Sequence, residues 1–331
     1  MKLDDLLSAW PIVGPLAVQP ITPGNNNLSY AVGTPGAQYI LRIYQNTAEQ
    51  DWICYEHSLL LRLDQLGLSF SVPAPIPARS GATLLPMPDG DGRLFAALFR
   101  YISGQQPSGD DLAQYRRCGA ALAELDHALG RVRINAPPAP RPPFGDLAQI
   151  HPAVPDPRGM LEHLPLEHTQ RVQLSRIVGD LLAVLPALYQ SLPQQIVHRD
   201  FDASNVLMAG DRVSGVLDFE FAGPDVRALD LARSLSMFTI SPWNIPDGWQ
   251  RVTAFILGYR EHIELTPAEI ETLPELMRLY RTWSMVHREG RRREGLVSEA
   301  DVLARAMALF RQDEWLGEQH QELERLLASP G

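Results

Sequence analysis

The sequence predicts an α+β protein of two lobes, a small lobe with an antiparallel sheet and one helix and a larger, mainly helical lobe. Short segments with strand-like alternation fill most of the chain before Gly104, and long amphipathic stretches follow it. A chain of 331 residues is long enough to give each lobe its own core. We expect the first lobe to span residues 1–101 and the second to span residues 102–331.

The first lobe is predicted to contain strands around one helix. The stretches LSYAV and QYILRIY alternate apolar and polar residues on either side of the turn-forming GTPGA, which predicts a hairpin over residues 28–44. In AEQDWICYEHSLLLRLDQLGL, residues 48–68, the apolar residues recur at helical spacing. The stretch RLFAALFRYISG then predicts a strand that ends in a glycine turn.

The second lobe begins with DDLAQYRRCGAALAELDHALGRV, residues 110–132, which predicts an amphipathic helix. The proline-rich APPAPRPPF, residues 136–144, suits neither a helix nor a central strand, so we expect a rigid surface connection there. Helix is predicted again over residues 168–192. A short strand-rich region follows, and the remainder is mostly helical.

Composition excludes several classes of protein. A net charge of −10 argues against an electrostatic grip on nucleic acid or on a membrane surface. Two cysteines, Cys54 and Cys118, make neither a disulfide framework nor a zinc cluster and favour a reducing compartment. The N-terminus lacks the apolar run of a signal peptide. We therefore expect a cytoplasmic protein, monomeric or homodimeric, without nucleic-acid or membrane partners.

The stretch IVHRDFDASNVLM, residues 196–208, carries the most specific motif. His198, Arg199 and Asp200 are followed after four residues by Asn205, which is the H-R-D-x-x-x-x-N spacing of a kinase catalytic loop. In that chemistry the aspartate accepts the proton of the attacking hydroxyl and the asparagine oxygen holds a metal ion. We predict Asp200 as the base, with His198 and Arg199 supporting the loop. The alternative for Arg199 is a contact with the γ-phosphate.

A second acidic residue follows in the next strand. Asp218 comes after the apolar RVSGVL, thirteen positions beyond Asn205, with MAGDR as the hairpin turn between them. Asparagine and carboxylate oxygens suit Mg²⁺, which keeps several waters and binds nucleotide phosphates as well. The two motifs together predict ATP and Mg²⁺ as cofactors, with Asn205 and Asp218 as the metal ligands.

A residue that grips ATP is expected upstream. Lys2 is the only lysine, so an arginine has to do this work. Arg42 lies on a predicted strand, and Glu56 shares the apolar face of the following helix. A carboxylate turned inward is costly unless it is paired, and the fork of Arg42 suits both a carboxylate and phosphate oxygens. We expect the two to pair. The alternative is that Glu56 lies at a rim in contact with water.

With these motifs the chain resembles the aminoglycoside phosphotransferase superfamily, the small-molecule branch of the protein-kinase-like fold, which includes type II homoserine kinases and choline kinases. The resemblance covers nearly the whole chain, and IVHRDFDASNVLM and GVLDFEFAGPDVRALDLA are its specific parts. It implies a bilobal kinase that transfers the γ-phosphoryl of ATP to a small-molecule hydroxyl. The stretch SGVLDFEFAGPDVRALDLARSL is most similar to homoserine-kinase-like members, so homoserine or a related amino-alcohol is the expected acceptor.

The resemblance also carries roles to single residues. Asp200 resembles the base, and Asn205 and Asp218 resemble the magnesium ligands. Arg42 stands where the family has its phosphate-binding lysine, and Glu56 stands at the position of the helix partner of that lysine.

Further roles follow from the same resemblance. Asp230 resembles the aspartate that braces the backbone of the catalytic loop. Phe99 and Tyr101 resemble the hinge whose backbone groups contact adenine. The usual glycine-rich loop is missing, and TPGNNNLSY occupies its place, so Asn26 and Asn27 are the expected donors to the phosphates.

The acceptor is predicted to be small, because only twelve positions separate Asp218 from Asp230 and leave no room for a segment that displays a peptide. Asp202 and Glu220 are candidate contacts to its amine, and the alternative is that they are ordinary turn or cap residues. Trp283 and His287 share one helical face and are candidate pocket residues, although a core-facing aromatic stripe explains them as well.

Three other functions compete with this reading. An aminoglycoside phosphotransferase would share the motifs and differ in its acceptor. A catalytically silent nucleotide-binding protein would have the same fold and bind the nucleotide without transferring its phosphoryl group. A metal-dependent phosphohydrolase would use His198, Asp200 and Asp202 as ligands on one face.

Overall fold

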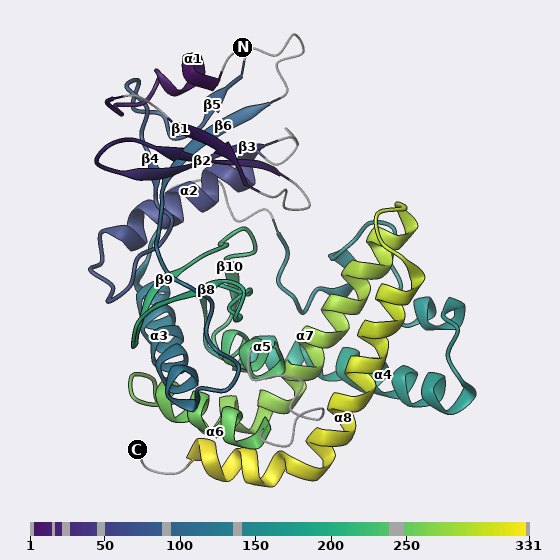
Figure 1. The fold of residues 1–331 in the computed structure, drawn as a ribbon. Helices are drawn as coiled ribbons and strands as arrows, with labels where there is room; N and C mark the ends of the chain where they lie inside the picture. The colour runs from purple at the N-terminus through teal and green to yellow at the C-terminus, as the bar shows by residue number, and fades with distance from the viewer. Residues whose placement is uncertain are drawn as a thin grey trace. The chain divides into compact units, whose positions relative to one another are not determined.

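A computed structural model describes residues 3–14, 17–21, 27–44, 50–87, 94–134, 141–237 and 248–328. Its internal contacts group the chain into two units, and the ribbon is drawn in Figure 1. The first unit comprises Met1–Gln105, Val132–Pro140 and Leu207–Glu220, and the second comprises the remainder. The expected boundary after Tyr101 falls close to the first of these breaks, whereas the return of residues 207–220 to the first unit has no counterpart in the prediction.

The first unit is built on an antiparallel sheet. Its strands follow the order β1 (Ala17–Pro20), β2 (Asn27–Gly33), β3 (Gln38–Tyr44), β6 (Phe95–Arg100) and β4 (Pro75–Ile76), and β5 (Leu85–Pro86) also pairs with β6. The turn between β2 and β3 is closed by a hydrogen bond of 2.9 Å from the amide of Thr34 to the carbonyl of Ala37. The hairpin predicted from the alternation of these residues is confirmed.

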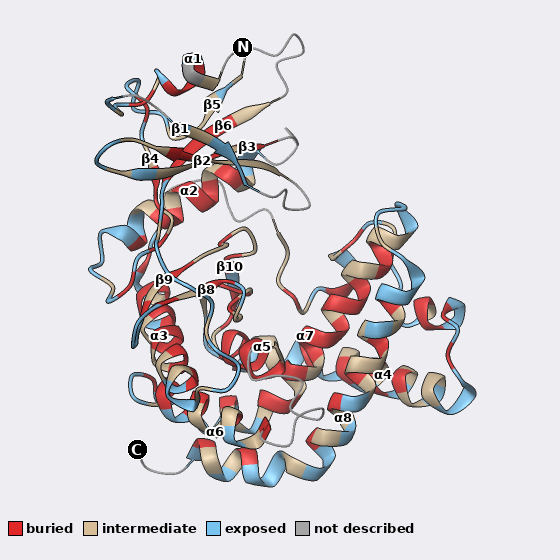
Figure 2. Ribbon diagram, in the orientation of Figure 1, coloured by how far each residue is buried: buried red, intermediate tan, exposed pale blue. Residues whose placement is uncertain are grey.

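The two faces of this sheet have different contents. Leu41 and Leu98 on one face share a core with Leu7 and Trp10, which belong to the N-terminal segment that forms α1 (Leu3–Leu7). Strand residues alternate between faces, so Arg42 lies on the other one, with Tyr44 and Phe99. Residues of α2 (Gln50–Asp64) contact this second face, and the helix carries a buried side, drawn red in Figure 2.

A hairpin from late in the sequence completes the first unit. Strands β8 (Val206–Ala209) and β9 (Arg212–Val216) pair around Gly210, whose φ of +59° suits the tight turn. Met208 exchanges two backbone hydrogen bonds with Gln105, at 2.7 and 2.9 Å, and Val216 donates to the carbonyl of Ser71. These pairings are between distant segments, which is why local sequence patterns did not predict where the hairpin belongs.

The second unit is mainly helical, so the predicted α+β class is confirmed. Its helices are α3 (Leu112–Arg131), α4 (His168–Ser191), α5 (Leu229–Met237), α6 (Gly248–Tyr259), α7 (Pro267–Arg293) and α8 (Glu299–Ala328). Short 3₁₀ helices occur at Leu147–Gln149 and Gly159–His163, and β7 (Gln194–Val197) pairs with β10 (Gly223–Val226). Helices α7 and α8 run side by side (Figure 1) and share a core with α4.

The proline-rich connection ends in the interior. Residues 136–140 lie outside the described residues, but Phe144 is 2 % exposed and stacks on Trp283 with 4.0 Å between ring centroids. Its amide donates a hydrogen bond of 2.9 Å to Asp225. The expectation of a surface connection is therefore wrong at Phe144, because this ring fills a space that only the tertiary fold creates.

One helix among the described residues, α4, is long and apolar enough to cross a membrane by its length and composition. Leu174, Ile177 and Val178 of this helix belong to the core that it shares with α7 and α8. Arg176 and Asp180 form an exposed ion pair on its surface. These contacts are those of a helix that packs in a protein core.

Candidate active site

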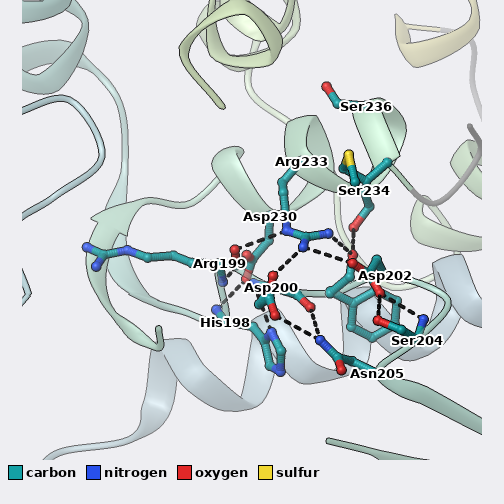
Figure 3. A network of polar contacts seen from close by, with 12 residues as sticks. His198, Arg199, Asp200, Asp202, Ser204, Asn205, Asp230, Arg233, Ser234 and Ser236 are labelled. Atoms are coloured by element: carbon teal, nitrogen blue, oxygen red, sulfur yellow. Dashed lines mark hydrogen bonds and ion pairs between the residues drawn. The ribbon is translucent and has the colours of Figure 1, made fainter. Parts of the chain in front are cut away.

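The loop predicted to be catalytic, residues 198–205, connects β7 to β8, and Figure 3 shows the polar contacts around it. The buried carboxylate of Asp230 in α5 accepts hydrogen bonds from the backbone amides of His198, at 2.5 Å, and Arg199, at 2.6 Å. Arg199 has a φ of +63°, in the left-handed region that few non-glycine residues adopt. Asp230 thus braces a strained turn, as the resemblance implied.

His198 contacts the loop from its buried side. The side chain is fully buried, and Nδ1 accepts a hydrogen bond of 3.1 Å from the amide of Asp200. The ring also meets Phe201 edge-on, with 6.2 Å between centroids. These contacts orient the backbone that carries Asp200, which is what a supporting residue does.

Arg199 turns its side chain into the second unit. The side chain is fully buried, and Nε lies 2.9 Å from the carboxylate of Asp225. The two Nη atoms donate to the carbonyls of Pro142, Phe221 and Pro224. Because these partners engage the whole guanidinium, the alternative in which Arg199 touches a phosphate is wrong, and Arg199 is a structural residue rather than a catalytic one.

Asp200 and Asn205 are joined directly by a hydrogen bond. Asn205 Nδ2 donates to the side-chain Oδ2 of Asp200 and to its backbone carbonyl, both at 2.9 Å. The amide oxygen of Asn205 therefore points away from Asp200, and it is the kind of ligand that Mg²⁺ prefers. The side chain of Asp200 is 23 % exposed, so it is partly accessible to solvent.

Arg233 in α5 was not predicted and makes the densest contacts with the loop (Figure 3). Its Nη2 donates to Asp200 Oδ1 and, at 3.0 Å, to Asp202 Oδ2. Burial opposes ionisation of Asp202, but Arg233 and Ser204 outweigh it and hold the pKa of Asp202 below its usual value. Ser204 also occupies Oδ1, so both oxygens of Asp202 have partners and the expected amine contact loses its support.

A signal for Arg233 exists in the sequence. It follows Asp230 by three positions in a helix, and residues at this spacing share a helical face. If Asp230 faces the catalytic loop, Arg233 faces it too.

A second buried carboxylate lies beside Asp230. Asp126 in α3 is fully buried and accepts a hydrogen bond of 2.8 Å from the hydroxyl of Tyr259 in α6. Burial and the neighbouring charge of Asp230 raise the pKa of Asp126 well above its usual value. Burial raises the pKa of Asp230 as well, while the two backbone amides that donate to its carboxylate oppose that rise.

In the first unit, Arg42 lies among the aromatic rings of β3 and β6. Its guanidinium carbon is 5.5 Å from the centre of the Phe99 ring and 6.0 Å from that of Tyr44. Burial disfavours the charge, but Tyr44, Glu56 and Asp218 together raise the pKa of Arg42 above its ordinary value. Glu56 is 6 % exposed, so the rim alternative is wrong, while the direct pairing of Glu56 with Arg42 stays a prediction.

His57 of α2 fixes the ring beside Arg42. Its Nδ1 and Thr83 Oγ1 are 2.9 Å apart, and its Nε2 and the hydroxyl of Tyr44 are 3.4 Å apart. Burial, with the charge of Arg42, lowers the pKa of His57 to about 3. The imidazole is therefore neutral near pH 7 and does not compete with Arg42 for anions.

Asp218 and Glu220 follow β9 in the first unit, and both are half-buried. Asp218 has a φ of +62°, and Arg199 and Asp218 are the two non-glycine residues with positive φ in the described part of the chain. Strain of this kind gathers at functional sites. Besides the effect of Asp218 on Arg42, the charge of Glu220 contributes, after burial and Glu56, to the raised pKa of Tyr44.

The predicted adenine and phosphate contacts have mixed outcomes. Phe99 is buried and paired on both sides, with Ile40 of β3 and Pro75 of β4. The amide of Tyr101 donates to the carbonyl of Gln38 at 3.2 Å, so it is engaged in the sheet and not available to adenine. Asn27 lies in β2 opposite Tyr44, and Asn26 lies outside the described residues.

Trp283 and His287 form a stacked column on α7. The indole stacks with the Phe144 ring, at 4.0 Å between centroids, and with the His287 ring, at 5.3 Å, and is nearly parallel to both. Burial and nearby arginines, Arg291 first, lower the pKa of His287 to about 4. These rings pack against one another, Trp283 and His287 are both half-buried, and their place in a substrate pocket stays a prediction.

The phosphohydrolase alternative finds no ligand set. In the part of the chain that is described, no three His, Cys, Asp or Glu side chains converge as a metal site. His198 uses its Nδ1 on the loop backbone, and Asp202 is paired with Arg233. The alternation of these residues in sequence does not bring them to one ion.

Comparison with known proteins gives consistent matches. The phosphotransferase enzyme family matches residues 17–265. Homoserine kinase from Beijerinckia indica is 30% identical over 286 residues, which cover 83% of this chain and 81% of that protein. Homoserine kinase from Methylobacterium radiotolerans is 31% identical over 290 residues, with the same two coverages.

Among solved structures, an amicoumacin kinase is similar with a TM-score of 0.69 at 18% identity, over 94% of this chain and 92% of that one. A microcompartment-associated aminopropanol kinase has a TM-score of 0.67 at 18% identity and covers 98% of both chains. These likenesses confirm the protein-kinase-like fold. The family match begins at β1 and extends beyond α6, so it contains the strand of Arg42, the loop of Asp200 and the brace of Asp230. The chain belongs to the phosphotransferase enzyme family.

Proposed function

We propose that this chain, a small-molecule kinase that transfers a phosphoryl group to an alcohol, uses ATP as donor and homoserine as acceptor. The homoserine kinases that it resembles match four-fifths of their own length, which supports an acceptor of this class. The observation that carries the kinase chemistry is the fixed, partly exposed carboxylate of Asp200. A carboxylate held in this way suits a group that orients a hydroxyl.

Asp200 is proposed as the base. Its Oδ1 accepts a hydrogen bond from Arg233 and its Oδ2 accepts one from Asn205, and we propose that this carboxylate also meets the acceptor hydroxyl. As the oxygen of the acceptor attacks the γ-phosphorus and the bond to ADP breaks, the hydroxyl proton passes to Asp200. Most of the rate gain in such a reaction comes from positioning and charge stabilisation rather than from basicity.

Magnesium and the phosphates need oxygen ligands and cations. Asn205 offers an amide oxygen turned away from Asp200, and Asp218 offers a carboxylate, so we propose both as magnesium ligands. When bound, Mg²⁺ neutralises charge on the phosphates of ATP. Arg42 remains charged under all working conditions and is proposed as the arginine that binds those phosphates.

A kinase assay with a panel of acceptors tests this function. ADP release is followed with purified protein, ATP and Mg²⁺, in the presence of homoserine, choline, ethanolamine, aminopropanol, a hexose or an aminoglycoside. We expect homoserine to give the highest kcat/KM. A clear preference for an aminoglycoside would replace homoserine as the acceptor. Binding of ATP without turnover on any acceptor would favour the silent nucleotide-binding protein instead.

A further inference from the structure

Three half-buried arginines gather where α7 packs on α8. Arg288 and Arg291 are on α7 and Arg305 is on α8, and we call them the arginine cluster. Within the described residues, none of the three side chains takes part in a hydrogen bond or an ion pair. Burial, then the charges of Arg305 and Arg291, lower the pKa of Arg288, and the exposed Asp301 offsets only part of this effect. The fold thus holds like charges together, and a bound anion would relieve their repulsion.

The next arginines of α7 show the contrast. Arg292 and Arg293 donate hydrogen bonds of 2.7–2.9 Å to the carboxylate of Glu289, which is fully buried. Their charges are therefore balanced within the helix. No acid among the described residues lies within ion-pair distance of Arg288 or Arg291. The excess of positive charge belongs to the cluster and not to the whole end of α7.

Two sets of contacts connect the cluster with the catalytic loop. In the first, the guanidinium of Arg233, which is ion-paired with Asp200, lies 5.1 Å from the centre of the Tyr280 ring. Burial lowers the pKa of the adjacent Arg281 to about 10, and the charges of Arg305 and Arg233 add to this effect. Arg281 is thus within electrostatic range of both the cluster and the arginine that binds the loop.

The second set runs through aromatic rings. Arg199 of the loop donates to the carbonyl of Phe221 at 3.5 Å. The Phe221 ring meets the rings of Trp283 and His287 edge-on, at 5.5 and 6.3 Å between centroids. Next to burial, Arg291 is the largest cause of the low pKa of His287. The cluster therefore borders the two rings that the sequence predicts for a substrate pocket.

We propose that Arg288, Arg291 and Arg305 form the subsite for the carboxylate of the acceptor, so that the enzyme selects a hydroxylated amino acid over an alcohol without an acid group. This rests on the proposed function, in which the acceptor is homoserine. Guanidinium groups bind carboxylates through strong charge-assisted hydrogen bonds. Choline or an aminoglycoside, which are cationic, would be repelled at the same place.

Two acceptors that differ only in the acid group test the subsite. Homoserine is compared with homoserinol, in which a hydroxymethyl group replaces the carboxylate. In Arg288→Gln and in Arg305→Gln, the ratio of kcat/KM for homoserine to that for homoserinol should fall about ten- to hundredfold, as expected for a lost charge-assisted hydrogen bond. The loss should lie in the KM for homoserine rather than in the KM for ATP. Arg311→Gln removes an exposed arginine of α8 outside the cluster and should leave the ratio as it is in the wild type.

An unchanged ratio in both cluster variants would overturn the proposal. A rise in the KM for ATP in place of the KM for homoserine would assign the cluster to the nucleotide and overturn it as well. Unfolding in urea separates binding from a structural role. Because each substitution removes a repulsion, the urea midpoint should stay the same or rise, and a clear fall in both variants would contradict the account.

A binding experiment distinguishes this subsite from the proposed function. Calorimetry uses L-2-aminobutyrate, which has the amine and carboxylate of homoserine but no hydroxyl group to phosphorylate. Binding that weakens about tenfold or more in the two cluster variants, and not in Arg311→Gln, would support the subsite even if the wild type phosphorylates no alcohol, a result that refutes the proposed function alone. Equal affinities in all variants, or no binding by the wild type, would overturn the subsite even in an active kinase.

Discussion

The two carboxylate oxygens of Asp200 have different partners. Arg233 binds Oδ1, and Oδ2 accepts a hydrogen bond from Asn205 and belongs to a side chain that is 23 % exposed. A carboxylate held from two sides offers a substrate hydroxyl one orientation, which removes part of the entropic cost of reaching the transition state. At the scale of single residues, this asymmetry is the feature on which the proposed chemistry depends.

Asp200→Asn should lower kcat by about 10²–10⁴-fold, because the variant keeps the shape of the side chain and loses the proton acceptor. ATP binding, measured by calorimetry, should be nearly unchanged. Asp180→Asn is the matched control, since this exposed carboxylate lies on α4 and forms an ion pair with the exposed Arg176. Near-normal turnover in Asp200→Asn would remove Asp200 from the role of base.

Arg42→Ala should raise the KM for ATP by about ten- to hundredfold, since hydrogen bonds to charged groups contribute about 1.5–3 kcal/mol. Arg100→Ala is the control, because this arginine lies on the neighbouring strand β6 and forms an exposed ion pair with Asp64. Steady-state kinetics with ATP varied at a saturating acceptor concentration give the measurement. An unchanged KM in Arg42→Ala would exclude it from the phosphate site.

At the scale of elements, local sequence patterns predicted the type of each element and the direction in which its side chains point. The alternation in QYILRIY placed Arg42 on a strand, and the helical spacing after Trp52 turned Glu56 inward. The H-R-D motif predicted Asp200 and Asn205 as the base and a metal ligand, and the structure adds a hydrogen bond between them across a loop of only a few residues.

Contacts between distant elements were the ones that sequence reasoning missed. Arg233 of α5 contacts the catalytic loop. Asp126 of α3 lies beside Asp230 of α5 because these two helices pack together. Arg199 follows the motif but turns toward Asp225, which its position in sequence does not reveal. The stacking of Phe144 on Trp283 joins segments that are more than a hundred residues apart.

The crossing of α3 and α6 depends on two glycines. A Cβ at Gly258 would lie 1.8 Å from the carbonyl oxygen of Arg116, and one at Gly119 would lie 2.0 Å from that of Phe255. These are backbone atoms of the partner helix, so the helices would have to move apart.

Gly258→Ala should therefore destabilise the protein by about 1–3 kcal/mol, as overpacking does. Gly317→Ala in α8 is the control. Nothing lies within 4 Å of a Cβ there, so this variant should be stabilised by about 0.5–1 kcal/mol through better helix propensity. Urea unfolding of both variants measures the difference, and equal midpoints for the two would contradict the close approach of the helices.

At the scale of the whole molecule, the proposed functional residues are divided between the two units. Arg42, Glu56 and Asp218 belong to the first unit, although Asp218 comes late in the sequence. Asp200 and Asn205 belong to the second. The hairpin of β8 and β9 is the covalent connection from the catalytic loop to Asp218, and its pairing with Ser71 and Gln105 fixes Asp218 within the first unit.

The stability of the whole protein should fall with rising pH through Asp126. Its pKa is raised in the folded state, so the folded protein binds a proton there that the unfolded chain releases near pH 3.8. The stability from this group is complete below that pH and is lost as the pH rises through the folded pKa. Asp126→Asn keeps a hydrogen-bond donor beside Asp230 but has no carboxyl group that titrates. The free energy of unfolding in urea should therefore depend less on pH in this variant than in the wild type. An unchanged slope would show that Asp126 is already ionised.

The most direct test of the central claim is the product itself. The protein is incubated with γ-labelled ATP, Mg²⁺ and homoserine, and the acceptor is analysed by mass spectrometry. We predict labelled homoserine phosphorylated on its hydroxyl oxygen, formed by the wild-type protein and reduced at least a hundredfold, in rough terms, in Asp200→Asn. Absence of phosphohomoserine while another alcohol is labelled, or equal formation by Asp200→Asn, would contradict the account.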